Sequence, residues 1–548
     1  MDISPILKNY KKIVESIGKS SFTHVGDTIY IIVEPNKLRE LAEILYWKMN
    51  CYHRTCVGVD ERPLNGHFAL YHIFGDDTNG LHIVVKVYID PEDPVVPSIT
   101  DIVPAADWCE LEAYDLLGIK FSGRKLYRLV LPPTWPHGVY PLRKETPYNY
   151  RPSVKIISGE EIGESHDKAV VPVGPYHPAL HEPEYFELYV EGERVVDVKY
   201  RGFHVHRGIE KLGESRTTYQ QVNFLAERIC GICGFEHSVC YALAVEKAAK
   251  IDVPERAQYI RSIVLEIERI HSHLLWIGVA AHVLGYDTGF MHIWRIRELV
   301  MYIAEKLTGS RKTYGINLIG GVRKDINEEK KKEVIEKLEI VEKDLKKLID
   351  TMVSVPELKK RLTGTGILPK SEARKLSVVG PTARGSGLDR DIRRDLPYAA
   401  YSEISFKVPV YSEGDNLARF LVRVEEVFES ISIVKQLLDQ LPRGDIMAES
   451  IEIPERKMGV AAVEAPRGED VHFIITGRGK PYRWKVRAPT YNNIPALKVM
   501  LRDQALADAP LTIASIDPCF SCTDRIVVIK DGRRYKLIPN KGGVVLYG

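Results

Sequence analysis

The pattern of apolar and polar residues changes character after about the first 147 residues. Before that point, β-branched runs such as "TIYIIVE" and "LHIVVKVYI" alternate with "KLRELAEILYWKM", in which Leu38, Leu41 and Leu45 recur at helical spacing. Runs of the first kind are typical of strands, and spacing of the second kind is typical of an amphipathic helix. Residues 1–147 are therefore predicted to form a compact α+β domain.

The chain beyond residue 168 is predicted to be mainly α-helical. The segment "YFELYVEGERVVDVKY" first predicts a β-hairpin that turns at Glu191–Gly192. Long stretches with one apolar and one charged face then predict four helices. These stretches cover residues 254–284, 291–307, 327–352 and 417–440. We expect residues 169–525 to form one large helical domain with small β elements.

The segments on either side of this domain have a different composition. A proline-rich stretch at residues 131–153 is followed by charged and small residues at 158–169, a combination typical of an extended linker, which we place at residues 148–168. Residues 526–548 predict two strands with a turn near Asp531–Gly532.

Charge and hydropathy narrow the choice of partners. The formal net charge of +2 over 548 residues is no basis for nucleic acid as the main partner. The most apolar run, residues 274–285, is far shorter than the roughly 20 residues of a bilayer-spanning helix. The first residues also lack the features of a secretory signal. We expect a cytoplasmic protein that reaches a membrane only through partner subunits.

Two Cys-x-x-Cys motifs carry the main chemical signal, "RICGICGFEH" at residues 228–237 and "DPCFSCTDR" at residues 517–525. Each motif brings two sulfurs onto one turn, as a metal ion requires. A zinc ribbon keeps its two pairs within a few tens of residues, whereas 285 residues separate Cys233 from Cys519. A thioredoxin-like redox pair needs only one motif and a βαβ setting. A buried nickel or iron centre is favoured, because soft sulfur binds these metals well and charged neighbours can tune the thiolates.

The two motifs together resemble the paired metal-binding motifs of the large subunit of NiFe hydrogenases. The ending "SCTDR" resembles the membrane-bound, energy-converting (group 4) branch, formate hydrogenlyase-type enzymes included. The segments "VPVGPYHPALHEPEYF", "GPTARGSGLDRDIRRDLPYAAY" and "EAPRGEDVHF" are similar to that branch and to the quinone-site subunit of complex I. In the first domain, "PSITDIVPAADWCELEAYDLLGIKF" resembles the 30-kDa-type subunit of complex I.

The resemblance implies a nickel–iron centre held by Cys230, Cys233, Cys519 and Cys522. All four sulfurs would bind nickel, and the second sulfur of each pair would also bridge to an iron that carries CO and cyanide ligands. The implied activity is reversible heterolytic cleavage of hydrogen, with the terminal thiolates of Cys230 and Cys519 as candidate bases.

Other residues take their expected roles from the same resemblance. Arg467 matches an arginine over the open metal position, where a fixed cation can polarise bound hydrogen. Pro489 and Thr490 match a loop that packs on the iron ligands. Glu182 lies where hydrogenases have a proton-relay glutamate, although a capping role is an equal alternative. An extra metal ion at Glu210 is in doubt, because Arg525 replaces the histidine that would share it.

The resemblance also implies partners. No cysteines remain in cluster-like spacing, so we expect the iron–sulfur clusters in a small subunit rather than in this chain. Antiporter-like membrane subunits and an electron donor, either ferredoxin or a formate dehydrogenase module, are implied as well. Nickel-insertion proteins and a maturation protease that cuts after Arg525 complete the expected set, which places the chain on the cytoplasmic side of the cell membrane.

Two alternatives remain open from the sequence alone. One is a complex I-like subunit that shapes a quinone pocket or carries electrons and has no nickel–iron centre. The other is an assembly scaffold that keeps the cysteines as a zinc staple. Four intact cysteines and Glu182 argue against the first alternative, because a quinone-site subunit does not need them.

Overall fold

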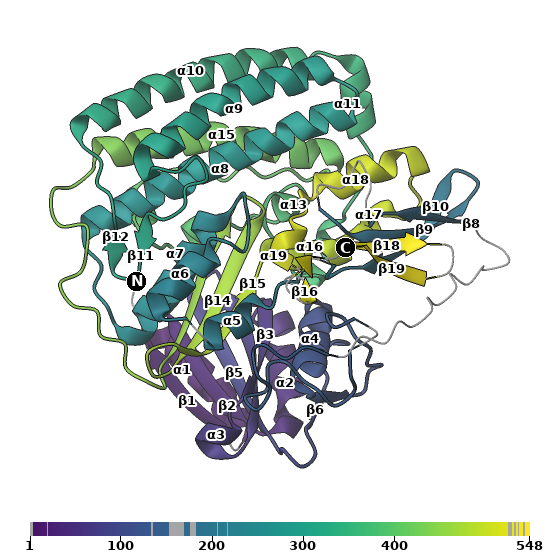
Figure 1. Ribbon diagram of the computed structural model, residues 1–548, viewed down its shortest axis with the longest axis vertical. Coiled ribbons are helices and arrows are strands. Elements are labelled where there is room, and N and C mark those ends of the chain that lie inside the picture. The colour runs from purple at the N-terminus through teal and green to yellow at the C-terminus, as the bar shows by residue number, and fades with distance from the viewer. Residues whose placement is uncertain are drawn as a thin grey trace.

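The computed structural model describes residues 4–18, 20–132, 135–152, 169–175, 182–204, 206–215 and 217–523. It also gives the backbone of short strands between residues 529 and 547. Three layers follow one another in Figure 1: a layer of long helices, a central sheet next to the shorter helices, and the N-terminal sheet at the opposite end. The predicted linker core, residues 153–168, lies outside the described residues.

The N-terminal layer is a five-stranded sheet in the order β1-β2-β5-β4-β3. Neighbouring strands are antiparallel except β2 and β5, which run parallel. The helices α1 (Ser4–Ile17), α2 (Leu38–Glu43) and α4 (Asp107–Leu117) share its hydrophobic core. The strands are β1 (Ser20–Val25), β2 (Thr28–Val33), β3 (Tyr52–Asp60), β4 (Phe68–Asp76) and β5 (Leu81–Ile89). The predicted α+β character of this region is confirmed.

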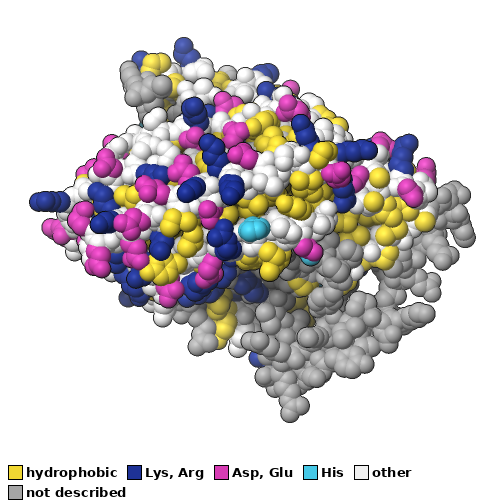
Figure 2. All heavy atoms as spheres, turned by 90° about the horizontal axis from the view of Figure 1, so that it is seen from above, with side chains coloured by type: hydrophobic (Ala, Val, Ile, Leu, Met, Phe, Trp, Pro, Cys, Tyr) yellow, Lys and Arg dark blue, Asp and Glu magenta, His cyan; other side chains and the backbone are white. Residues whose placement is uncertain are grey.

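Four long helices form the opposite layer: α8 (Glu255–Val283), α9 (Asp287–Thr308), α10 (Glu328–Val353) and α15 (Asn416–Asp439). Each agrees with its predicted range to within a few residues. The outer helix α10 buries only one stripe of apolar side chains, so the helical spacing of these residues predicts the helix from the sequence. Seen from this side, basic and acidic side chains are interspersed over the surface (Figure 2). Among the described residues, no helix combines the length and apolarity needed to cross a bilayer.

The central sheet positions the residues of the site. It consists of the antiparallel strands β13 (Met458–Ala465), β14 (Gly468–Thr476) and β15 (Pro481–Arg487). Ala465 pairs with Gly468, so Pro466 and Arg467 form a two-residue turn at the tip of the first hairpin. A Cβ at Gly468 would lie 2.5 Å from the backbone nitrogen of Gly380, so this close approach requires glycine.

A smaller sheet combines β8 (Ala169–Val173), β9 (Tyr185–Glu191) and β10 (Arg194–Arg201). Strands β9 and β10 form the predicted hairpin. The backbone beyond residue 525 forms two hairpins, β16 (Ile529–Lys530) with β17 (Arg533–Arg534) and β18 (Lys536–Asn540) with β19 (Gly543–Tyr547). The predicted single hairpin was wrong in number, because the chain turns a second time after Asn540. The side chains of residues 524–548 lie outside the described part.

Candidate metal centre

The four predicted cysteines meet at one buried point. Cys230 and Cys233 come from the loop before α7 (Gly234–Ala249), and Cys519 and Cys522 lie at the short helix α19 (Phe520–Thr523). The Sγ–Sγ distance is 3.3 Å from Cys230 to Cys519, 3.6 Å from Cys233 to Cys522 and 2.9 Å from Cys519 to Cys522. All four thiols are free, and their sulfurs lie within 4.8 Å of one another. Sulfurs at this spacing can surround an ion at a metal–sulfur distance of about 2.3 Å.

The first cysteine turn is built to hold an anionic sulfur. The backbone amides of Ile232 and Cys233 point at the Cys230 sulfur, at 3.2 and 3.3 Å. Helix α7 begins directly after Cys233, so the positive end of its dipole faces the centre. At Gly234, a Cβ would lie 2.4 Å from the carbonyl oxygen of Glu227, which makes glycine necessary at the start of this helix.

The electrostatics of the four sulfurs favour a single thiolate in the metal-free chain. Hydrogen bonds from the thiols of Cys233, Cys519 and Cys522 hold the pKa of Cys230 well below its ordinary value. The pKa of each of the other three thiols is raised. Metal binding displaces the remaining protons, because only thiolates are strong ligands.

Arg467 supplies a buried cation beside this anionic cluster. Its Nε donates to the Asp517 carbonyl oxygen at 2.8 Å and its Nη2 to Asp517 Oδ1 at 2.8 Å, while Nη1 donates to Ser272 Oγ at 3.1 Å. Burial disfavours the charged guanidinium, but Asp517 and the thiols raise its pKa well above the ordinary value. Arg467 is 2% exposed, which excludes an ordinary surface ion pair.

The second cysteine motif is held from two sides. The Cys519 amide donates to Thr490 Oγ1 at 3.1 Å, at the start of helix α16 (Pro489–Asn493). On the other side, the Glu182 carboxylate accepts the Ser521 amide at 2.7 Å and also the Ser521 hydroxyl. Glu182 therefore binds a backbone amide in the first turn of α19, the short helix that begins after Cys519 and contains Cys522. Its relay role, and the contact of Pro489 and Thr490 with iron ligands, remain predictions.

Arg207 joins the two motifs, and the sequence did not reveal this role. Its Nη1 donates to the Arg228 carbonyl oxygen at 2.7 Å, and its Nη2 to those of Ile229 at 2.5 Å and Ser521 at 3.1 Å. Arg207 thus binds the residue before Cys230 and the residue before Cys522. Only its place in "HVHRGIEKL" could have drawn notice, because nothing in local spacing predicts contacts 314 residues apart.

A buried chain of polar groups leads away from Cys522. His237 Nε2 lies 3.5 Å from the Cys522 sulfur, and His237 Nδ1 lies 2.8 Å from Asp470 Oδ2. His472 Nε2 lies 3.3 Å from the same carboxylate oxygen. Trp484 Nε1 donates to His472 Nδ1 at 3.2 Å, so the His472 proton must sit on Nε2 and point at Asp470. His237 Nδ1 also lies 3.3 Å from His472 Nε2. The ligand atoms of His237, Asp470 and His472 lie within 4.8 Å of one another, a spacing at which they could also hold a metal ion. The alternation of Asp470 and His472 along β14 is the signal that could have found this chain.

Glu210, where an extra metal ion is in doubt, is bonded to strand β15. Its carboxylate accepts Arg483 Nη1 at 2.8 Å and the Val486 amide at 3.1 Å, and it is buried. These bonds anchor helix α5 (Ile209–Ser215) to strand β15.

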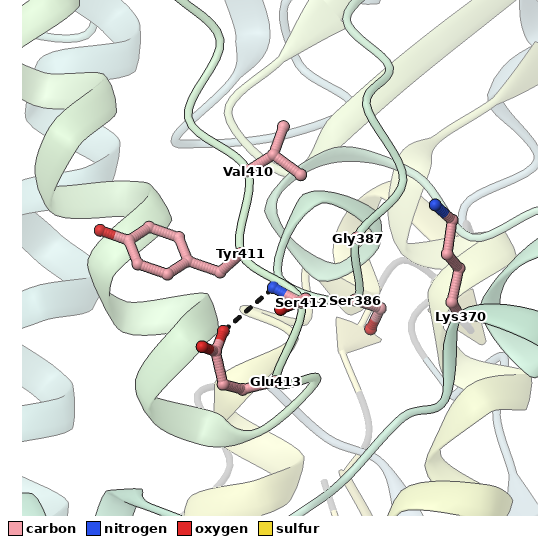
Figure 3. Close-up of a pocket in the computed structure, with 7 residues that line it drawn as sticks. All are labelled: Lys370, Ser386, Gly387, Val410, Tyr411, Ser412 and Glu413. Carbon is pink, nitrogen blue, oxygen red and sulfur yellow. Dashed lines mark hydrogen bonds between the residues drawn. The ribbon is translucent and has the colours of Figure 1, made fainter.

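The surface also has a hollow of about 350 Å³ that is separate from the cysteines. Figure 3 shows Tyr411 directed toward the neighbouring helix and Lys370 on the other side of the hollow, with the Ser412 amide bonded to Glu413 at 3.0 Å. None of the predicted site residues lines this hollow. The candidate site is therefore the four-cysteine cluster.

The stability of the fold should depend on pH through Glu227, three residues before Cys230. Burial raises its pKa to about 6, against about 4.3 in an unfolded chain. The folded state holds this proton more tightly than the unfolded chain does. The contribution of Glu227 to the free energy of unfolding is therefore complete below about pH 4.3 and is lost as pH rises through about 6. Glu227→Gln should remove this loss, which is worth at most about 2 kcal/mol, while still accepting the Gly315 amide.

The measurement is the melting temperature across this pH window. The matched control is Glu339→Gln on the exposed face of α10, which should keep the pH dependence of the parent chain. If the melting temperature of Glu227→Gln changed with pH as steeply as that of the parent chain, Glu227 would not titrate in this window.

Comparison with known proteins assigns the fold and the centre to two related classes. The models of the respiratory-chain NADH dehydrogenase 30 Kd and 49 Kd subunits match residues 31–152 and residues 284–460 and 446–525. The nickel-dependent hydrogenase model matches residues 207–279, which include the first cysteine pair.

Individual relatives agree with this assignment. The chain is 43% identical to formate hydrogenlyase subunit 5 of Escherichia coli over 94% of this chain and 92% of that protein. It is 42% identical to hydrogenase-4 component G of the same organism, over 94% and 91% of the two chains. A solved structure of the archaeal membrane-bound sulfane sulfur reductase has a TM-score of 0.63 at 32% identity, covering 66% of this chain and all of that chain.

The chain belongs to the family of group 4, membrane-bound NiFe hydrogenase large subunits that are fused to a complex I 30-kDa-type domain. The resemblance and the fold class expected from the sequence are both confirmed.

Proposed function

We propose that this chain is the catalytic subunit of a hydrogenase complex that interconverts hydrogen with protons and electrons at a nickel–iron centre. One observation carries the proposal: four free cysteines, contributed by motifs 285 residues apart, bury their sulfurs around one point. A quinone-site subunit does not need this arrangement, and the family membership agrees with it.

The residues present fit such a centre. Four soft sulfur donors suit nickel and iron, and a buried guanidinium suits a cluster whose cyanide ligands add negative charge. Cys230, Cys233, Cys519 and Cys522 would hold the metals. When bound, the pair of metals supplies the open site at which hydrogen is polarised and split.

The chain's own residues then position and move the proton. The sulfurs of Cys230 and Cys519 are the candidate bases, and Asp517 holds the guanidinium of Arg467, whose pKa these thiols raise. The Glu182 carboxylate bonds to Ser521, between the two cysteines of the second motif. It can therefore accept a proton that leaves Cys519 and pass it outward.

Glu182→Gln is expected to slow hydrogen production by about 10- to 100-fold while the nickel content stays at the parent level. Glutamine still accepts the Ser521 amide, so this bond survives, but it cannot take up a proton. Glu187→Gln on strand β9 is the matched control, because its partners Tyr189 and Lys199 lie away from the cysteines. Parent-like hydrogen production in Glu182→Gln would exclude the relay role.

The complex around the chain is part of the proposal. Electrons would pass through iron–sulfur clusters of a small subunit, and antiporter-like subunits would anchor the assembly to the cytoplasmic side of the membrane. A ferredoxin or a formate dehydrogenase module would donate electrons. Nickel-insertion proteins and a protease would mature the chain, with residues 526–548 removed after Arg525.

The direct functional test is isotope exchange between deuterium gas and water, measured by mass spectrometry on the complex purified without oxygen. This assay needs no electron donor, so it reports the split of hydrogen alone. We expect exchange that depends on nickel supplied during growth. A complex that holds the mature chain and nickel but catalyses no exchange would contradict the proposal.

A further inference from the structure

The N-terminal domain packs directly against the sheet that carries Arg467. Figure 1 shows the N-terminal sheet next to strands β14 and β15. At this boundary the Tyr71 and Phe473 rings lie with their centroids 5.2 Å apart. Arg483 Nε donates to the Gly58 carbonyl oxygen at 3.0 Å, and Arg487 Nε donates to that of Arg54 at 2.9 Å. The two domains therefore share one continuous interior.

A buried ionic network crosses this boundary at Glu469. Arg54 of β3 bonds through Nε to Glu469 Oε2 at 2.9 Å and through Nη2 to Asp77 Oδ1 at 2.7 Å. Arg390 bonds to both of these carboxylates, and Arg487 bonds to Glu469. Burial opposes the ionised carboxylate, but Arg390, Arg54 and Arg487 hold the pKa of Glu469 well below its ordinary value. Removing any one of these side chains would leave an oppositely charged partner buried and unpaired, which is strongly destabilising.

This network holds the hairpin that presents Arg467. Glu469 lies two residues from Arg467 and pairs with Glu464 across the base of the hairpin. Glu464 accepts Arg384 Nη1 at 2.8 Å, so both strands of the hairpin are tied by arginines. The tip then reaches Asp517, two residues before Cys519. A shift of Glu469 would move the guanidinium of Arg467 relative to the sulfurs.

A second tie leads to the other support of the cysteines. Glu112 of helix α4 accepts Lys485 Nζ at 2.5 Å and the Tyr491 hydroxyl at 3.1 Å. The Trp108 ring, one turn earlier on α4, meets the Tyr491 ring edge-on at a centroid distance of 5.3 Å. Tyr491 directly follows Thr490, whose hydroxyl oxygen accepts the Cys519 amide. The N-terminal domain thus reaches the second motif by two separate routes.

We propose that the N-terminal domain is a positioning element of the metal centre, in which Arg54 fixes the hairpin of Arg467 and Glu112 fixes the helix of Thr490. Neither residue touches the sulfurs, so both act through the segments that they hold. The inference rests on the proposed function only for its turnover readout, because the positions of both segments can be measured without metal.

The test compares Arg54→Gln with Asp27→Asn in the full chain. Asp27 bonds to Lys247 at 2.5 Å, so it also joins the N-terminal domain to the rest of the chain, but among the described residues its side chain bonds only Lys247 and Thr28, which belong to neither route. Hydrogen–deuterium exchange of the metal-free chain is followed by mass spectrometry for residues 465–472, with residues 328–353 of α10 as the internal reference. We expect about tenfold faster exchange over residues 465–472 in Arg54→Gln, and no change in the reference or in Asp27→Asn.

Two further variants separate positioning from general stability. Arg54→Lys keeps the charge but loses the fork that binds two carboxylates, so its exchange and its turnover should lie between those of the parent and Arg54→Gln. Glu112→Gln should speed exchange over residues 488–493 but leave residues 465–472 at the parent rate. If Arg54→Gln does not fold, Glu112→Gln still tests the proposal through its own segment, residues 488–493. In the metal-loaded complex, hydrogen turnover should fall in parallel with the local exchange.

Three outcomes decide the matter. Local acceleration confined to the named segments supports the proposal, even if the parent complex shows no hydrogen turnover, in which case only the proposed function fails. Parent-like exchange in Arg54→Gln and Glu112→Gln overturns it. Acceleration spread equally over α10 and the hairpin also overturns it, because the ties would then stabilise the chain generally without positioning the centre.

Discussion

Cys522→Ser is expected to abolish nickel binding and hydrogen turnover together. The Cys522 sulfur lies 2.9 Å from that of Cys519 and 3.6 Å from that of Cys233, so it is central to the cluster. A hydroxyl is a harder and far less acidic donor than a thiol, and it cannot replace a thiolate as a ligand of soft metals. Nickel per chain and hydrogen production should both fall by more than about 100-fold.

The matched control for this variant is Cys240→Ser. Cys240 is also fully buried, seven residues after Cys233, but its thiol donates to the carbonyl oxygens of Ala461 and Asp470 and does not face the other sulfurs. A serine hydroxyl can make the same bonds, so nickel and turnover should stay near parent values. Nickel retained at the parent level in Cys522→Ser would remove this cysteine from the centre.

Arg467→Lys is expected to keep nickel but to lower hydrogen turnover by about 100-fold. The arginine makes two bonds to Asp517 and one to Ser272 in a fixed plane, an arrangement that the single ammonium of lysine cannot reproduce. The positive charge remains inside the protein, so the four thiolates should still assemble around the metal. The measurement is the initial rate of hydrogen production, divided by the nickel content of the same sample.

Arg228→Lys provides the comparison at a site beside the cluster. Arg228 precedes Cys230 by two residues, yet its side chain is 52% exposed and lies over the Tyr314 ring at 4.6 Å. Lysine can occupy this surface position, and turnover should not change. If Arg467→Lys also turned over at the parent rate per nickel, the arginine would have no part in the chemistry.

The long helices could be predicted because apolar residues recur along each of them at helical spacing, on the face that packs against the core. In α10, the buried positions recur every three or four residues, and the positions between them are partly or fully exposed. The buried residues are Val334, Leu338, Val341, Leu345, Ile349 and Met352. The same logic located α9 and α15. Helix α8 is buried on nearly every side, and its charged residues Glu266 and Arg269 pair with each other inside the core. Periodicity located this helix but could not reveal the pairing.

The cysteines could be predicted because all four lie in two short Cys-x-x-Cys motifs that are recognisable in the sequence. The contacts that orient them could not, since they join residues that are hundreds of positions apart. Arg207 reaches Ser521, and His237 reaches Asp470, only through the tertiary fold. Arg54 and Glu469 likewise lie 415 positions apart, so nothing local to either residue predicts that the first domain supports the metal-binding hairpin.

The boundaries between domains were predicted from composition and remain predictions. Proline-rich and charged stretches indicated a linker at residues 148–168, but a linker in sequence does not mean separation in space. The Lys144 ammonium, just before that linker, donates to Glu214 at 2.8 Å. Contacts of this kind make the first 147 residues a part of the same folded body as the helical region.

The measurement that tests the central claim most directly is metal analysis of the chain purified without oxygen, combined with its infrared spectrum. We expect nickel and iron in about equal amounts, close to one of each per chain, and absorption bands from CO and cyanide bound to iron. Zinc alone, or no metal with four reduced thiols, would contradict the account and would leave the cysteine cluster as a structural element of a complex I-like subunit.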